Sequence, residues 1–278
     1  MENISIQHIC SGIIDSHAHY FDRRFENEYD GGADRLLSET VFPLGIEAII
    51  NVGTDPENSL RCIEQAAKYE KMYAAVGIHP EDCQHLPCDA DTEVAKIRDL
   101  LDTEEKRRKN KIVAIGEIGF DYYWQPVQKD RQREFFERQL SLASELDLPV
   151  IIHDRDAHGD CFEAVLKYPS VRGVFHSYSG SAEMAKELTR RGWYISFSGV
   201  ITFKNAKRAR EVAAVIDPEM ILVETDCPYL SPEPFRGRLN SSANLCYTVR
   251  ELASVLGKTP EETIALTNRN TRRLFSLK

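Results

Sequence analysis

The sequence predicts an α/β protein: a single-domain TIM (β/α)8 barrel over residues 1–278, with C-terminal helices. Short apolar runs, rich in β-branched residues, alternate with longer amphipathic stretches of helical period. The runs mostly lack polar alternation, which is typical of parallel strands covered on both faces. Eight such strand–helix units fit a closed barrel, in which reactive side chains lie at the carboxyl ends of the strands.

The expected strands are the apolar runs at 13–14, 46–52, 73–76, 112–115, 148–152, 173–175, 193–197 and 221–223. Amphipathic helices are expected at 58–68, 132–146, 182–191 and 207–216, and two further helices at 244–256 and 260–275 should close the barrel. An open doubly wound sheet is the alternative. It is disfavoured because no Gly-x-Gly-x-x-Gly follows the first strand.

Composition limits the class of protein. A chain of 278 residues, 42% hydrophobic, can form one large core. Its net charge of −9 argues against nucleic-acid binding over the whole surface, though not against a local basic site. Seven cysteines without a Cys-x-x-Cys pair predict free thiols in a reducing compartment, and Cys83 with Cys88 is only a weak zinc-knuckle candidate.

Residues 1–8 have neither the basic start nor the apolar core of a signal peptide. No apolar run approaches the ~20 residues that a membrane span needs. We therefore expect a soluble, cytoplasmic protein that does not use a membrane, and no obligate protein partner is evident from the sequence.

A pair of histidines, His17 and His19, ends the first expected strand. Side chains at i and i+2 leave a strand on the same side, so both imidazoles can reach one metal ion. Such a pair in isolation is more often hydrogen-bonded core or surface. Later strands also end in residues that can bind metal, namely His79, Glu117, His153, His176 and Asp226. Imidazoles and carboxylates gathered in this way suit divalent transition metals.

Two carboxylates have predicted chemical roles. Glu117 stands between Gly116 and Gly119, which we expect to let a metal ion and substrate approach the backbone closely. Its carboxylate could bridge two cations and reduce their repulsion. Asp226, after the last strand, could bind one metal ion and accept a proton from water, which makes it the expected general base.

Six segments in order resemble the successive motifs of the TatD family of metal-dependent deoxyribonucleases. They are DSHAH at 15–19, VGIHP at 76–80, AIGEIG at 114–119, PVIIH at 149–153, HSYSG at 176–180, and ETD at 224–226 followed by PYL at 228–230. The resemblance covers residues 13–275 and implies a barrel of the amidohydrolase type with one to three divalent cations, Mg²⁺, Mn²⁺ or Zn²⁺. It also implies the metal ligands His17, His19, Glu117, His153, His176 and Asp226.

The chain departs from the family pattern outside these ligands. Ser177 and Tyr178 follow His176 where Cys and Phe are more usual, and Glu81 stands where a further histidine is common. Residues 236–242 keep an Arg-Gly pair but lack the usual Arg-Asn-Glu-Pro. The departures concern substrate contacts rather than hydrolysis.

The resemblance implies a hydrolase of phosphodiester bonds, a deoxyribonuclease acting 3′→5′ on single-stranded DNA or 3′ ends. Metal coordination lowers the pKa of water toward ~7, which would supply a metal-bound hydroxide, with Asp226 as base and Glu117 as bridge. One alternative is hydrolysis of another ester or amide, such as an aminoacyl-tRNA ester. Another is a non-catalytic binding barrel, against which the six intact ligands count.

Substrate contacts are expected from three places. His79 could donate to a phosphate oxygen, or be a hydrogen-bonded loop residue. Lys204, which opens the basic segment 204–210, and Arg236 would place positive charge near the metal ions, although a solvated helix face is the alternative for this segment. The aromatic residues 122–124 could stack bases or pack under their loop. The charge run at 104–111 is expected to be a solvated loop at the opposite end of the barrel.

Overall fold

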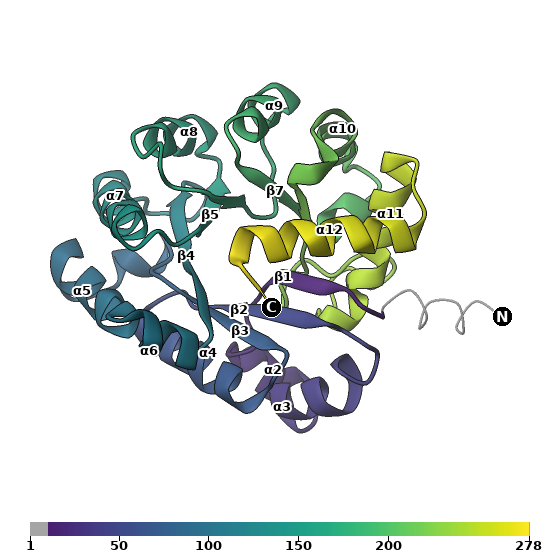
Figure 1. Ribbon diagram of the computed structural model, residues 1–278, viewed down its shortest axis with the longest axis horizontal. Helices are drawn as coiled ribbons and strands as arrows, with labels where there is room; N and C mark the ends of the chain where they lie inside the picture. Colours follow the sequence, from purple (N-terminus) through teal and green to yellow (C-terminus); the bar gives the residue numbers. More distant parts are fainter. Residues whose placement is uncertain (1–10, 278) are drawn as a thin grey trace. The chain divides into compact units, whose positions relative to one another are not determined.

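The computed structural model describes residues 11–277, and eight strands form one sheet in chain order (Figure 1). The strands are β1 (Ile14–Ala18), β2 (Ala48–Val52), β3 (Met72–Val76), β4 (Ile112–Asp121), β5 (Val150–Arg155), β6 (Gly173–Phe175), β7 (Tyr194–Phe197) and β8 (Ile221–Val223). The strand pairs β3–β4, β4–β5, β5–β6 and β7–β8 all run parallel. The residues on which the signal-peptide prediction rests, 1–8, lie outside the described part.

The described residues divide into two compact units, which we call unit 1 (11–50 and 177–277) and unit 2 (51–176). In unit 1 the last strand returns to the first. Ala18 forms a parallel bridge with Cys227, and the Asp226 N–H donates to the His17 carbonyl oxygen at 2.9 Å. Eight parallel strands thus form a nearly closed barrel, which confirms the predicted TIM class and excludes the open doubly wound sheet. The assignment of residues 1–278 to a single domain stays a prediction.

The helices of unit 1 are α2 (Arg23–Glu28), α3 (Gly32–Leu36), α9 (Ala182–Arg190), α10 (Lys207–Val215), α11 (Leu245–Leu256) and α12 (Pro260–Phe275). Its short turns of 3-10 or π type are η1 (Leu37–Val41), η3 (Gly199–Thr202), η4 (Pro218–Met220) and η5 (Ser242–Asn244). The C-terminal helices α11 and α12 are those that the sequence predicts. Within residues 11–277, no helix has both the length and the apolar character for crossing a membrane.

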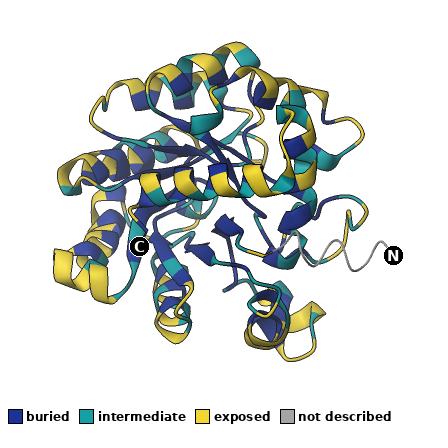
Figure 2. Cartoon of the chain, turned by 45° about the vertical axis from the view of Figure 1, so that its right-hand side comes forward, coloured by how far each residue is buried: buried dark blue, intermediate teal, exposed yellow. Residues whose placement is uncertain are grey.

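The helices of unit 2 are α4 (Pro56–Lys68), α5 (Ala90–Leu101), α6 (Glu104–Lys109), α7 (Lys129–Leu146) and α8 (His158–Leu166), with the 3-10 turn η2 (Asp82–Gln84). Figure 2 shows the strands buried, while the helices carry exposed stripes beside buried ones. On α7 the buried stripe recurs at helical spacing, with residues 132, 135, 136, 139, 140 and 143. The buried strands therefore form a rigid framework that supports the side chains at their carboxyl ends.

The prediction of a solvated loop at residues 104–111 is wrong, because residues 104–109 form the helix α6. Thr103 caps it by accepting the Lys106 N–H, and Glu104 and Glu105 occupy its first turn. Acidic residues at the start and basic residues at the end of a helix both favour helix formation. None of its residues is buried, so the expected exposure is correct.

The glycines around Glu117 have a packing role that the sequence did not predict. A Cβ at Gly116 would lie 2.7 Å from the Ile151 Cβ, and one at Gly119, where φ is +146°, would collide with the His153 carbonyl oxygen. These glycines let the neighbouring strand β5 approach β4, and this contact fixes the backbone that carries Glu117 and His153.

Replacing Gly119 by alanine should lower the free energy of unfolding by roughly 2–4 kcal/mol, through backbone strain and overpacking against β5. Thermal denaturation checks this. Gly159→Ala is the matched control: nothing lies within 4 Å of an added Cβ there, and the residue is in α8. That change should leave stability unchanged or raise it by up to ~1 kcal/mol. Equal melting temperatures for Gly119→Ala and the unmodified protein would contradict this packing role.

Candidate metal centre

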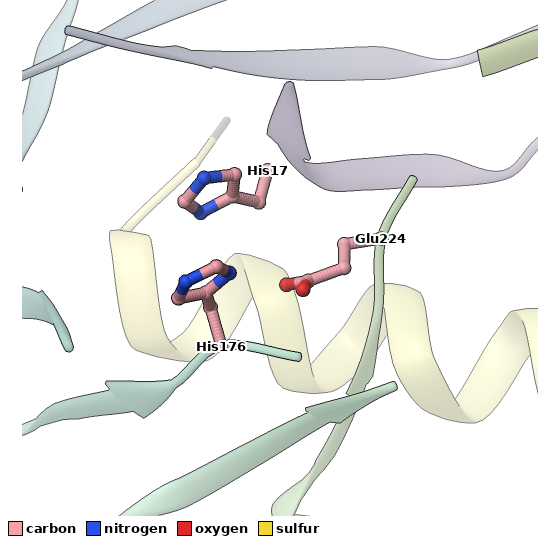
Figure 3. Close-up of side chains that lie close together, drawn as sticks. All are labelled: His17, His176 and Glu224. Carbon is pink, nitrogen blue, oxygen red and sulfur yellow. The ribbon is translucent and has the colours of Figure 1, made fainter. Parts of the chain in front are cut away.

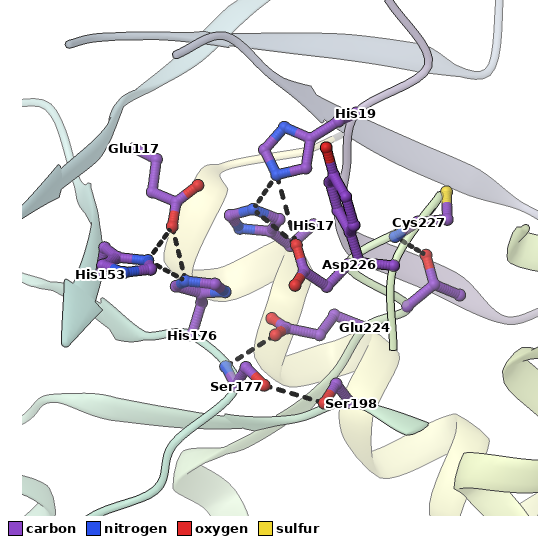
Figure 4. Close-up of polar contacts among 12 residues, drawn as sticks. His17, His19, Glu117, His153, His176, Ser177, Ser198, Glu224, Asp226 and Cys227 are labelled. Carbon is purple, nitrogen blue, oxygen red and sulfur yellow. Dashed lines mark hydrogen bonds and ion pairs between the residues drawn. The ribbon is translucent and has the colours of Figure 1, made fainter. Parts of the chain in front are cut away.

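Three of the predicted ligands meet in unit 1 (Figure 4). The Nε2 atoms of His17 and His19 are 3.0 Å apart, and the Asp226 Oδ1 lies 3.6 Å from the first and 3.3 Å from the second. Two nitrogens and an oxygen at this spacing have the geometry of ligands that share one divalent cation at ~2.0–2.2 Å. Both histidines are buried, so packing restricts the movement of the donor atoms.

A buried carboxylate, Asp15, fixes this arrangement from behind. It accepts hydrogen bonds from the Thr225 N–H at 2.9 Å, the Thr225 hydroxyl at 2.6 Å and the Ser242 hydroxyl at 2.6 Å. Burial raises the pKa of Asp15 to about 6 despite these donors. Since Thr225 precedes Asp226 and Asp15 lies two residues before His17, the network sets the position of β1 against the end of β8.

Glu224 is a further candidate ligand in unit 1 that the sequence-based set omits. Its side chain is buried, and its Oε1 accepts the Ser177 N–H at 2.7 Å. A carboxylate oxygen of Glu224 and a ring nitrogen of His17 lie within 4.8 Å of one another (Figure 3). A fully buried carboxylate needs a cationic or hydrogen-bonding environment, and this one has both a backbone donor and an imidazole beside it.

Unit 2 holds the second cluster, centred on Glu117 of β4 (Figure 4). The Glu117 Oε1 lies 2.6 Å from the His153 Nδ1 and 2.6 Å from the His176 Nε2. These two nitrogens are 3.2 Å apart. The carboxylate therefore faces two imidazoles at once, and the donor set fits a divalent metal ion.

His153 is oriented by Asp121, a buried carboxylate that the sequence-based set also omits. The Asp121 Oδ2 lies 3.0 Å from the His153 Nε2. Burial opposes a positive charge on the imidazole, but the Glu117 carboxylate and the hydrogen bonds to Asp121 and Glu117 raise the pKa of His153 to about 9. Once Nδ1 has lost its proton, the Nε2–H bond to Asp121 leaves the Nδ1 lone pair directed at Glu117 and His176, where a cation would lie.

Two buried glutamines of α7 hold the backbone on both sides of this cluster. The Gln132 side chain accepts the Asp121 N–H at 3.0 Å and donates to the Asp121 carbonyl oxygen at 2.8 Å. Gln139 makes the same pair of bonds with Ile78, at 2.7 and 3.0 Å. Each glutamine thus satisfies the N–H and the carbonyl oxygen of one buried residue. Gln132 fixes the backbone at Asp121, and Gln139 fixes it next to His79.

Asp121→Asn should lower metal affinity or turnover by about 10- to 100-fold, the usual effect of losing a partner that orients a metal-binding histidine. The amide nitrogen can donate to Nε2, which would place the imidazole proton on Nδ1 and block the ligand atom. Titration calorimetry with Mn²⁺ and Zn²⁺ measures the change. Asp91→Asn, on an exposed residue of α5, is the matched control. Equal affinities for both variants would show that Asp121 does not set the tautomer.

His79, predicted to contact phosphate, lies beside the unit 2 cluster. Its Nδ1 accepts the Glu81 N–H at 3.1 Å, so its proton is on Nε2, 3.7 Å from the Glu117 Oε1. A ligand atom from each of His79, Glu117 and His153 lies within 4.8 Å of the other two. His79 accepts the loop bond from Glu81 through Nδ1 while its Nε2–H is directed at the cluster. Its two expected roles, as a hydrogen-bonded loop residue and as a donor to phosphate, are therefore compatible.

The predicted basic contacts, Lys204 and Arg236, are both exposed in unit 1. The Arg236 guanidinium carbon lies 4.4 Å from the centroid of the Phe203 ring, next to Lys204 in the chain. Arg210, in contrast, donates to the carbonyl oxygens of Ile201 and Phe203 and supports the loop from within. The loops that carry Lys204 and Arg236 therefore lie next to each other. Arg210 stabilises the first of these loops by its hydrogen bonds.

The zinc-knuckle alternative is not supported by the surroundings of Cys83. Its thiol donates to the Pro80 carbonyl oxygen at 3.1 Å, and burial raises the pKa of Cys83 to about 12. A metal ligand must be a thiolate, which this environment disfavours.

Comparison with known proteins identifies the family of this chain. The family model described as TatD related DNase matches residues 14–276. The chain belongs to the TatD family. Of the six predicted TatD-type ligands, three lie within strands, namely His17 in β1, Glu117 in β4 and His153 in β5. The other three, His19, His176 and Asp226, follow the ends of β1, β6 and β8.

TatD-family relatives match almost the whole chain. YabD of Bacillus subtilis (strain 168), an uncharacterized metal-dependent hydrolase, is 38% identical over 268 residues, which cover 95% of this chain and 99% of YabD. The uncharacterized metal-dependent hydrolase TatD of Mycobacterium tuberculosis is 35% identical over 257 residues, with coverages of 89% and 93%. The crystal structure of YjjV, a TatD homologue from Escherichia coli K12, superimposes with a TM-score of 0.86 at 29% identity, covering 97% of this chain and 100% of YjjV. This TatD-family chain is a metal-dependent hydrolase.

Proposed function

We propose that this TatD-family hydrolase cleaves phosphodiester bonds in DNA, as a 3′→5′ exonuclease acting on single strands or 3′ ends. The observation that carries the proposal is the pair of histidine–carboxylate clusters. One cluster, in unit 1, contains His17, His19 and Asp226, and the other, in unit 2, contains Glu117, His153 and His176. Because reactive groups lie at the carboxyl ends of strands in a TIM barrel, we propose that each cluster holds a divalent cation for hydrolysis.

The proposed roles of the side chains follow from their positions. A divalent cation lowers the pKa of a coordinated water and stabilises negative charge on phosphoryl oxygens. His17, His19 and Asp226 would hold one cation, and His153 and His176 a second, with the Glu117 carboxylate directed at both imidazoles of unit 2. Asp226 would also accept the proton of the attacking water, since its carboxylate oxygen lies 3.3 Å from the His19 Nε2, beside the cation that would coordinate that water.

Phosphodiester specificity is supported by positive charge on two neighbouring loops. Lys204 and Arg236 are exposed residues on a chain whose net charge is −9. A hydrolase of neutral esters has no need for such cations, whereas each nucleotide of a DNA substrate brings one negative phosphate. His79 adds an Nε2–H next to the unit 2 cluster, suitable for donation to a phosphate oxygen.

The direct test is cleavage of DNA labelled at the 3′ or 5′ end, with Mg²⁺, Mn²⁺ or Zn²⁺ supplied in turn. We expect a ladder that shortens from the 3′ end and releases nucleoside 5′-monophosphates. Single-stranded RNA, a neutral acyl ester and aminoacyl-tRNA complete the substrate panel. The proposal is wrong if DNA remains intact with each metal while an ester or aminoacyl-tRNA is hydrolysed.

The charge argument has its own test. Lys204→Ala with Arg236→Ala should raise KM for single-stranded DNA and flatten the log–log salt dependence of binding by ~0.7 per lost phosphate contact. The matched control, Arg108→Ala with Lys109→Ala, removes two exposed charges from α6, which precedes the amino end of β4. Equal salt slopes for the two double variants would exclude Lys204 and Arg236 as phosphate contacts.

A further inference from the structure

Two adjacent aromatic residues at the end of β4, Tyr123 and Trp124, expose 52% and 48% of their surface. Their rings meet edge to face, with centroids 4.9 Å apart and planes at 88°. The expectation that they pack under their loop is therefore wrong for both, because the loop leaves about half of each residue in solvent. Adjacent exposed rings are a feature of ligand surfaces rather than of protein cores.

A cation lies against the same rings. The Arg155 guanidinium carbon is 3.9 Å from the Tyr123 centroid and 5.5 Å from the Trp124 centroid. The preceding ring, Tyr122, has the Lys129 Nζ at 4.0 Å from its centroid. Aromatic faces combined with guanidinium and ammonium groups are how proteins bind single-stranded nucleic acid, with bases on the rings and phosphates on the cations.

The aromatic pair is tied to the unit 2 cluster. Asp121 accepts the N–H groups of Tyr123 and Trp124 through Oδ1, at 2.9 and 3.3 Å, while its Oδ2 faces His153. Arg155 lies two residues beyond His153 on β5, so the two side chains leave that strand on the same side. One carboxylate thus sets the position of the aromatic turn and of the histidine.

The surface beside the pair is concave. A hollow of about 860 Å³ adjoins the turn, within the range of small-molecule sites. It is lined by Tyr122 and Gln125, which flank the aromatic pair in the chain, and by Val127, Gln128, Lys129, Asp130, Arg131 and Asp156. Besides one apolar residue and two carboxylates, the lining offers amides and cations, which are suited to the base edges and phosphates of a nucleotide.

We propose that Tyr123, Trp124 and Arg155 form a base-stacking subsite for single-stranded nucleic acid, next to the histidine cluster of unit 2. The ligand class rests on the proposed nuclease function. The subsite binds the bases of nucleotides near the scissile bond, and Arg155 keeps its guanidinium edge available to a phosphate while its face covers Tyr123. Binding is therefore sensitive to the presence of bases, which a surface that recognises phosphate alone would not be.

The test compares two ligands of equal charge: a short oligothymidylate and an abasic oligomer of the same length. Both carry phosphorothioate linkages, so that cleavage does not interfere with fluorescence anisotropy of the metal-loaded protein. The unmodified protein should bind the oligothymidylate about tenfold more tightly or better, the effect of at least one base–aromatic stack. Tyr123→Ala with Trp124→Ala should bind both ligands equally.

Two further variants separate stacking from folding. Tyr123→Phe with Trp124→Phe keeps both rings and should retain the preference for bases. Tyr69→Ala removes a ring that also has a lysine beside it, with the Lys68 Nζ at 5.8 Å, but precedes the amino end of β3, and it should change nothing. The subsite is excluded if the unmodified protein shows no preference for bases, or if the double alanine variant keeps it.

Cleavage of unmodified oligothymidylate is measured in parallel and separates this proposal from the nuclease proposal. Cleavage without any contribution of the rings to binding would retain the nuclease and remove the subsite. Ring-dependent binding without cleavage would retain the subsite and remove the nuclease. Absence of both would overturn the two proposals together.

Discussion

Asp226→Asn should lower kcat by about 10²–10⁴ while most bound metal is retained. The amide oxygen can still coordinate a cation weakly and is nearly isosteric, but an amide cannot accept a proton at neutral pH. The histidines that share the site, His17 and His19, are untouched, and the backbone bond from residue 226 to the His17 carbonyl oxygen remains. Single-turnover cleavage together with metal analysis by mass spectrometry measures the two effects separately.

Asp217→Asn is the matched control, because Asp217 is exposed and precedes the amino end of β8, whereas Asp226 follows its carboxyl end. Asparagine also caps short helical turns well, so stability should hold. A near-normal kcat for Asp226→Asn would assign the proton to another acceptor. Loss of metal in parallel with kcat would instead make Asp226 mainly a ligand.

His17→Ala with His19→Ala should remove the cation of unit 1 and abolish turnover. The pair supplies two of the three donor atoms that lie within 3.6 Å of one another, and carboxylate binding alone is weak. The loss in affinity should exceed the roughly 10- to 100-fold that removal of an outer partner costs. The unit 2 cluster keeps Glu117, His153 and His176, so the metal content should fall by one equivalent rather than to zero.

His85→Ala controls for the loss of an imidazole, since His85 is exposed and outside both clusters. Circular dichroism in the presence of a chelator shows whether the double variant still folds, because His17 is fully buried. An unchanged metal content in a folded double variant would exclude unit 1 as a metal site.

The strands could be predicted where apolar runs are uninterrupted. The expected ranges 173–175 and 221–223 are those of β6 and β8. The expected strand at 112–115 is too short, because β4 continues to Asp121 through Gly116 and Gly119. Glycine weakens a strand pattern in sequence, but here it is required by the approach of β5, and only the folded neighbour shows this.

Five helices, α2, α3, α5, α6 and α8, are outside the sequence-based set of amphipathic segments. Four of them have nine residues or fewer and short apolar stripes, whereas α5 has twelve residues and buries Val94, Ile97 and Leu101 at helical spacing. Side chains cap α5 at Asp89 and α6 at Thr103, but α3 and α8 have no side-chain cap. A cap stabilises a helix by only about 1 kcal/mol, so it marks a boundary well only where an apolar stripe is also present.

The ligands on strand ends could be predicted because they interrupt or end apolar runs. Three supporting carboxylates, Asp15, Asp121 and Glu224, lie in the same segments but were not assigned roles. Their function depends on distant partners: Asp121 contacts His153, 32 positions away, and Asp15 contacts Thr225, 210 positions away. A local signal did exist, since a carboxylate within a buried run needs compensation by donors or cations.

The pairing of β1 with the end of β8 brings together ligands that are synthesised far apart in time. Glu117, His153 and His176 are separated by 36 and 23 positions, so the ribosome releases the whole unit 2 cluster from one continuous stretch. His17 and His19 are made first but wait for Asp226, which follows about 50 residues after His176, or roughly 3–10 s at ordinary translation rates. All ligands of the unit 2 cluster are therefore synthesised before those of the unit 1 cluster, and a chain that stops short of β8 carries the ligands for one proposed cation but not for the other.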